Sequence, residues 1–76
     1  MSALLPPPAQ QVQLQPGDAY YLEAGNYHLR VQAGNVWVPE VGIFSAGEQV
    51  TLTVDATGLA IHSYAQQPAV LAVRGQ

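Results

Sequence analysis

The chain contains no cysteine and no lysine, and only two histidines occur among its 76 residues. Without cysteine, the fold cannot be stabilised by a disulfide bridge or by a thiolate metal site. A structural zinc site is also disfavoured, because the chain has only two histidines. A chain of this length forms one domain and buries only about 60% of the surface that its unfolded form exposes. Oligomerisation is the remaining way to bury more apolar surface.

Charged residues are also scarce, at 9% of the sequence against about 25% in ordinary soluble domains. A monomer with so few charges would expose an unusually neutral surface. A subunit that neighbours cover on several sides has less surface to solvate. The composition therefore favours a protein that works within an assembly.

The charge balance and the lack of long apolar runs exclude several classes of partner. A net charge of −3 does not suit phosphate binding, which needs clustered Lys and Arg, so we expect no nucleic-acid partner. No apolar run approaches the roughly 18 residues of a membrane span. Residues 1–8 lack the basic start and long apolar centre of a signal peptide. We therefore expect a chain that is made without processing and has no membrane partner.

Short alternations of apolar and polar residues recur along the chain and predict an all-β fold. Residues 49–54 are the clearest case, because Val50, Leu52 and Val54 alternate with polar neighbours as in a half-buried strand. Turn residues separate seven or eight such segments, and no ten-residue stretch has a helical period. We predict a small antiparallel sandwich or barrel of seven to eight short strands.

Residues 27–38 are predicted to form a hairpin at the centre of this domain. Apolar and polar residues alternate along residues 27–32, and residues 36–38 are all apolar. The Ala-Gly-Asn sequence at residues 33–35 tolerates positive φ, so a tight hairpin is the economical interpretation.

Residues 1–10 are predicted to be an extended, proline-rich arm, and residues 11–76 to be a single β domain. Three consecutive prolines in the arm fix φ and favour polyproline II. Two interpretations stay open: the arm is a disordered tail, or it docks on a neighbouring subunit with little loss of entropy because it is stiff. In the docking interpretation, the contacting residues are Leu4, Leu5, Pro6, Pro7 and Pro8.

Trp37 and Tyr21 are the predicted interface anchors within the β domain. Val36 and Val38 share one face of their strand, so Trp37 must point to the other face. If the valines face the core, an outward tryptophan beside few charges indicates an interface. Burial on both sides and a role as a ligand platform are the alternatives for Trp37.

No residue pattern indicates an enzyme, a metal site or a cofactor site. Ser45 and Ser63 occur in strand segments without a Gly-x-Ser-x-Gly elbow, and no glycine-rich phosphate loop leads into a helix. His28 and His62 could lie near each other, but two ordinary half-exposed histidines are the simpler interpretation. The glutamates that could complete a metal site, none at a characteristic spacing, are Glu23, Glu40 and Glu48. We predict a non-enzymatic protein.

Residues 14–31 (L-Q-P-G-D-A-Y-Y-L-E-A-G-N-Y-H-L-R-V) resemble the openings of small all-β structural proteins of tailed-phage virions. The shared features are a Pro-Gly-Asp turn, an aromatic strand and a Gly-Asn-Tyr step. The resemblance implies a capsid decoration or cement subunit, or a small neck or tail component. Such a subunit would pack against itself, for example as a trimer, and against a capsid shell. Its location would be the virion, with the cytoplasm as the alternative.

A second resemblance is to cupin-like small barrels. It is carried by the Pro-Gly-Asp turn at residues 16–18, by His28 and by the run F-S-A-G-E-Q-V at residues 44–50. The cupin metal motif clusters two histidines and a glutamate on one strand. Here only His28 is near such a place, and Glu23 is at no matching spacing. The resemblance therefore implies the fold, and a small ligand-binding module as the alternative function, without the metal site.

Overall fold

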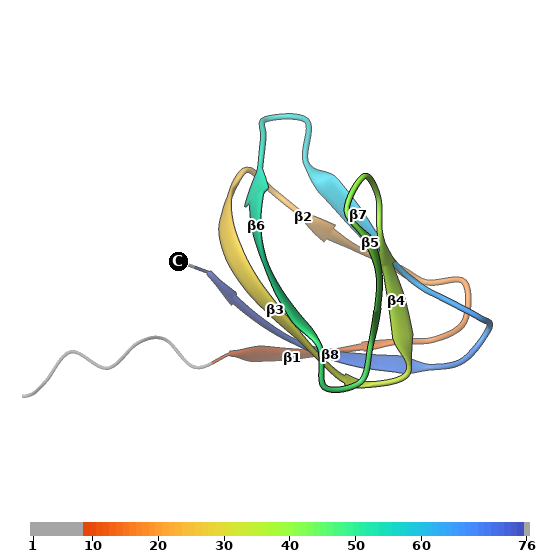
Figure 1. Ribbon diagram of the computed structural model, residues 1–76. Coiled ribbons are helices and arrows are strands. Elements are labelled where there is room, and N and C mark those ends of the chain that lie inside the picture. Colours follow the sequence, from red (N-terminus) through yellow and green to blue (C-terminus); the bar gives the residue numbers. More distant parts are fainter. Residues whose placement is uncertain (1–8, 76) are drawn as a thin grey trace, which may run out of the picture.

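The computed structural model describes residues 9–75, which form two antiparallel sheets of four strands each (Figure 1). The predicted all-β fold is confirmed, with eight strands. They are β1 (Gln10–Leu14), β2 (Ala19–Leu22), β3 (Gly25–Ala33), β4 (Asn35–Val38), β5 (Gly42–Ser45), β6 (Gln49–Val54), β7 (Leu59–Ser63) and β8 (Ala69–Gly75). The predicted arm contacts Leu4, Leu5, Pro6, Pro7 and Pro8 lie outside the described residues.

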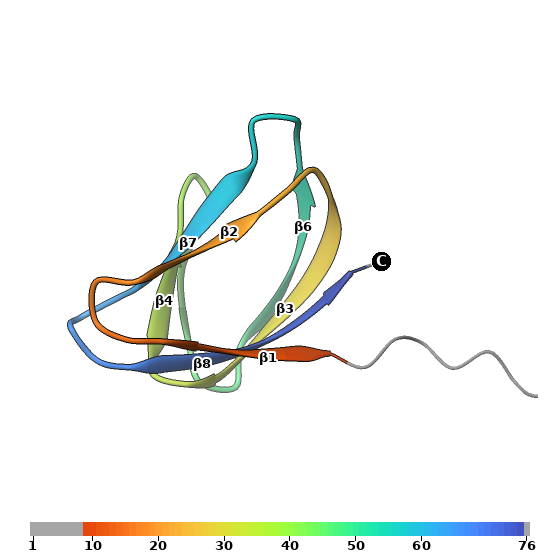
Figure 2. The ribbon, with the colours of Figure 1, turned by 180° about the vertical axis from the view of Figure 1, so that it is seen from behind.

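The chain changes sheet at almost every connection. Sheet A has the strand order β1-β8-β3-β6, and sheet B has the order β2-β7-β4-β5. Among the strands of residues 9–75, only β4 and β5 are consecutive strands that pair with each other. The views from both sides show β1 beside β8 in one layer and β2 beside β7 in the other (Figure 2). This strand order is that of an eight-stranded jelly roll.

Apolar side chains fill the space between the two sheets. The period of two along each strand turns alternate residues inward, as in β6, where Leu52 and Val54 are buried and Thr53 is exposed. None of the buried side chains among the described residues is polar or charged. The buried core consists of Val12, Leu14, Leu22, Leu29, Val31, Val36, Val38, Leu52, Val54, Ile61, Ala69, Leu71 and Val73.

The predicted hairpin at residues 27–38 is wrong. β3 pairs with β6 and β8 in sheet A, whereas β4 pairs with β5 and β7 in sheet B. Gly34, with a φ of 73°, carries the chain from one sheet to the other. A β carbon at Gly34 would lie 2.3 Å from the carbonyl oxygen of Pro68, so the crossing needs glycine for close approach as well as for φ. The Ala-Gly-Asn sequence does separate two strands, as predicted, but the second of them, β4, joins the opposite sheet.

The structure adds detail to the sequence prediction in β1 and β5. β1 begins at Gln10, the last residue assigned to the arm, and Gln10 pairs with Val73 of β8. In β5, Phe44 packs against the core and Ile43 faces outward. Within residues 9–75, the structure has no helix long and apolar enough to cross a membrane.

Candidate functional site

The outward side of sheet B carries large apolar side chains. Trp37 of β4 is 44% exposed, Ile43 of β5 is 48% exposed and Tyr21 of β2 is 68% exposed. The register pairs Trp37 with Ile43 on one side and with His62 on the other, so the row crosses adjacent strands. The outward direction predicted for Trp37 is confirmed. We call this surface the apolar face; its residues are Ala19, Tyr21, Trp37, Ile43, Ala60 and His62.

Trp37 is held in place by its neighbour on β7. Its ring stacks on the ring of His62 with a centroid distance of 5.3 Å and an angle of 29° between the planes. Such an offset stack is a favourable aromatic arrangement and limits the rotation of both rings. The tryptophan is therefore presented outward in a defined orientation, which lowers the entropy that it would lose in a contact.

Tyr21 lies on the same face, with β7 between its strand and that of Trp37. Its ring packs over the β6–β7 turn, where a β carbon on Gly58 would lie only 2.7 Å from Tyr21 Cε1. Its cross-strand neighbour on β7 is the small Ala60, which leaves the ring exposed. The fold thus brings both predicted anchors to one surface and adds Ile43, which the sequence analysis did not single out. Because β5 has only four residues, its alternation alone could not identify the outward side chain.

The outward side of sheet A has the opposite character. Its side chains join strands through hydrogen bonds. Gln11 Nε2 of β1 donates to Gln32 Oε1 of β3 at 2.9 Å, across the intervening strand β8. Thr53 Oγ1 of β6 donates to Asn26 Oδ1 of the adjacent strand β3 at 2.9 Å. We call this surface the polar face. Its polar residues are Gln11, Gln13, Asn26, His28, Arg30, Gln32, Gln49, Thr51, Thr53 and Arg74.

The distribution of charge follows the same division. None of the four strands of sheet B contains a formally charged residue. Both arginines of the chain, Arg30 and Arg74, lie on sheet A. All five carboxylates lie in the connections between strands, and they are Asp18, Glu23, Glu40, Glu48 and Asp55.

The polar face is hollowed around its two arginines. Ala72, directly opposite Arg30, has a small side chain and leaves space between Arg30 and Arg74. The hollow has a volume of about 390 Å³. We call it the arginine hollow; it is lined by Ala9, His28, Arg30, Gln32, Gln49, Ala72 and Arg74. No local pattern in the sequence indicates this cluster, because Ala9 precedes β1 and the other members come from β3, β6 and β8 and meet only through the strand pairing.

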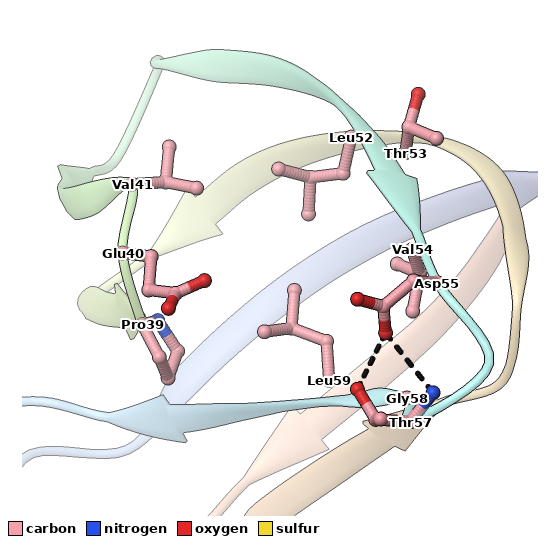
Figure 3. A pocket seen from close by; sticks show the side chains of 10 residues that line it. All are labelled: Pro39, Glu40, Val41, Leu52, Thr53, Val54, Asp55, Thr57, Gly58 and Leu59. Carbon is pink, nitrogen blue, oxygen red and sulfur yellow. Dashed lines mark hydrogen bonds between the residues drawn. The ribbon is translucent and has the colours of Figure 1, made fainter.

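A smaller hollow of about 130 Å³ opens between the β4–β5 turn and the β6–β7 turn (Figure 3). Leu52 and Leu59 form its apolar floor, and the carboxylates of Glu40 and Asp55 point into it from opposite sides (Figure 3). Thr57 donates hydrogen bonds from its hydroxyl and its backbone N–H to Asp55 Oδ1. These bonds, the side-chain one foremost, lower the pKa of Asp55 from its ordinary value of 3.8.

The two histidines do not meet, so the expectation that they could lie near each other is wrong. His28 pairs with Thr51 and Arg74 on the polar face, whereas His62 lies on the apolar face. Residues 9–75 contain no group of three or more His, Cys, Asp or Glu side chains that could hold a metal ion.

Comparison of this chain with protein-family models, with curated proteins and with solved structures finds no match. The jelly roll occurs in viral capsid proteins, in lectin domains and in cupins. The fold by itself therefore does not choose among functions. The two outward faces carry the chemistry that distinguishes one function from another.

Proposed function

We propose that this protein is a non-enzymatic structural subunit of a virion, most simply a capsid decoration or cement protein, with a neck or tail component as the alternative. It acts by packing against copies of itself and against a capsid shell. The observation that supports this function is the apolar face. The resemblance of residues 14–31 to small phage structural proteins is the reason for proposing a virion as the assembly.

The apolar face has the composition of a protein interface. Trp37 and Tyr21 are residue types that dominate the binding energy of interfaces, and both are held by packing within the subunit. Ile43 extends the surface to the edge strand β5. Contiguous exposed apolar residues of this kind are rare on proteins that work as monomers.

A second copy of the chain is the partner that fits this face. The four strands beneath it carry no formal charge, so two apolar faces can approach without repulsion between like charges. A contact between two polar faces would instead bring Arg30 and Arg74 of one copy toward those of the other. We therefore assign the contact between copies to sheet B.

The predicted arm belongs to a separate contact. Ala9, the residue after the triproline segment, lines the arginine hollow on sheet A. Docking by Leu4 and Leu5 would therefore start from the side of the sandwich opposite to the apolar face. A subunit with two separate contact surfaces can bind a shell and its own copies at the same time, which raises the overall affinity.

The experiment that tests this function compares two substitutions two residues apart. Ile43→Lys places a charge in the apolar face, whereas Val41→Lys places one in the β4–β5 turn, where Val41 is similarly exposed at 50%. We expect the mass from light scattering to show an oligomer for the parent chain and for Val41→Lys, and a monomer for Ile43→Lys. A parent chain that is monomeric at all concentrations, or equal masses for the two variants, would contradict the assignment.

The location in the virion needs its own test. Antibody raised against the chain is applied to purified particles from its source, and electron microscopy records the label. We expect label on the particle surface or at the neck or tail. Label confined to the cell interior would remove the virion from the proposal and leave the assembly on sheet B intact.

A further inference from the structure

The arginine hollow offers hydrogen-bond donors and few acceptors. Gln49 Oε1 lies 2.8 Å from His28 Nε2, and Gln32 Oε1 accepts a hydrogen bond from Gln11 Nε2 at 2.9 Å. Because both amide oxygens have an intramolecular partner, the groups that Gln49 and Gln32 present to a ligand are their Nε2 amides. The side chains of Arg30 and Arg74 carry donors alone.

His28 supports this arrangement. Its Nε2 faces Gln49 Oε1, and its Nδ1 lies 3.4 Å from Thr51 Oγ1. With the proton on Nε2, the ring donates to the amide oxygen and orients the Gln49 amide group. His28 is therefore a positioning residue of the hollow.

The charge of the hollow is opposite to that of the whole chain. Net charge is −3, yet the hollow gathers both arginines and none of the five carboxylates is among its lining residues. Arg74 is directly opposite His28 and Arg30 is directly opposite Ala72, so the two arginine residues lie on a diagonal across β3 and β8. A ligand that lies over Ala72 can contact both of them.

We propose that the arginine hollow binds a small ligand through an oxyanion group, a carboxylate or a phosphate, held between Arg30 and Arg74. Guanidinium groups form charge-assisted and often bidentate hydrogen bonds with such oxyanions. The amides of Gln32 and Gln49 add neutral donors at the same site. A volume of about 390 Å³ suits a ligand of modest size. This inference does not depend on the proposed contact between copies, because the apolar face lies on the other sheet.

The test uses two-dimensional amide NMR spectra of the full chain at constant ionic strength. Inorganic phosphate and succinate are the two oxyanion probes, and succinamide is the neutral probe of the same shape as succinate. We expect phosphate, succinate or both to shift the signals of Ala72 and of the Gln32 and Gln49 side-chain amides, and succinamide to shift none of them. The tighter probe identifies the preferred oxyanion. An absence of shifts with both anions, or equal shifts with succinamide, would overturn the proposal.

Substitutions then tie the binding to the arginines. Arg30→Gln and Arg74→Gln each remove a charge-assisted pair, and we expect affinity to fall by about tenfold or more. Ala72→Glu places a carboxylate between the arginines and should abolish binding. Gln13→Glu makes the same change in net charge elsewhere on the polar face and should leave binding unchanged. Affinity equal to that of the parent chain in both arginine variants, or equal loss in Ala72→Glu and Gln13→Glu, would overturn the proposal.

Discussion

The two outward faces of this sandwich are built on the same backbone pattern but differ in chemistry. On sheet A, side-chain hydrogen bonds such as Thr53 to Asn26 join neighbouring strands, and both arginines of the chain are present. On sheet B, Trp37 stacks on His62, and no strand carries a formal charge. The strand alternation decides which residues point outward. The residue types at those outward positions decide whether a face suits water and polar ligands or another protein surface.

The largest effect on stability is expected from a substitution at Gly34, where the chain passes from one sheet to the other. Gly34→Ala would bring a β carbon to 2.3 Å from the backbone oxygen of Pro68, so the backbone must move. We expect the free energy of unfolding to fall by more than about 2 kcal/mol. Urea unfolding followed by circular dichroism measures this loss.

Gly47→Ala is the matched control for that substitution. Gly47 also has a positive φ, of 92°, but no atom lies within 4 Å of a β carbon built there. We expect Gly47→Ala to cost about 1 kcal/mol, from backbone conformation alone. Equal costs at the two glycines would show that the close approach of Gly34 to Pro68 contributes nothing.

The second effect concerns the association through the apolar face. Trp37→Ala removes the stacked anchor, and we expect the dissociation constant of the oligomer to rise by about 30-fold, as for an interface hot spot of about 2 kcal/mol. Val41→Ala is the control, because Val41 has a similar exposure of 50% and lies in the β4–β5 turn. Sedimentation velocity over a range of concentrations measures both constants. If Val41→Ala weakens the oligomer as much as Trp37→Ala, the contact does not lie on the apolar face.

Salt should affect binding at the arginine hollow and association through the apolar face differently. Raising sodium chloride from about 0.05 M to about 0.5 M screens exposed charges, so oxyanion binding at the arginine hollow should weaken severalfold. Association through the apolar face should stay constant or strengthen, because burial of apolar surface does not depend on charge. NMR titration measures the first quantity and light scattering the second. A parallel loss of both with salt would contradict the division between the faces.

The smallest effect is a pH dependence of stability at the turn that joins β6 to β7. The hydrogen bonds from Thr57 lower the pKa of Asp55 in the folded protein below its ordinary value of 3.8. A carboxyl group of this kind stabilises the fold above its unfolded pKa, and that contribution is lost as the pH falls through the folded pKa. We expect the melting temperature of the parent chain to drop below about pH 4 more steeply than that of Asp55→Asn. Identical pH profiles for the two proteins would contradict this account.

Much of the fold could be predicted from local patterns in the sequence. The alternation in residues 49–54 identified β6 and its inward side chains, and the placement of Val36 and Val38 gave the outward direction of Trp37. These predictions succeed because the period of two is a local property of a strand. The number of strands followed from the spacing of turn residues in the same way.

The pairing of strands could not be predicted, because it depends on segments that are far apart in the sequence. The hairpin expected at residues 27–38 failed since β3 pairs with β8, near the end of the chain, and not with β4. The same non-local pairing brings Arg30 beside Arg74 and separates His28 from His62. Both candidate surfaces are therefore properties of the topology that no single segment contains.

The most direct test of the central claim, that another copy covers the apolar face, uses the intrinsic fluorescence of Trp37. It is the only tryptophan of the chain, so its emission reports on that face alone. We expect the emission to shift to shorter wavelength, and quenching by acrylamide to decrease, as the protein concentration rises through the range in which the mass doubles or triples. Emission and quenching that stay constant across assembly would show that the apolar face remains exposed to water and would contradict the claim.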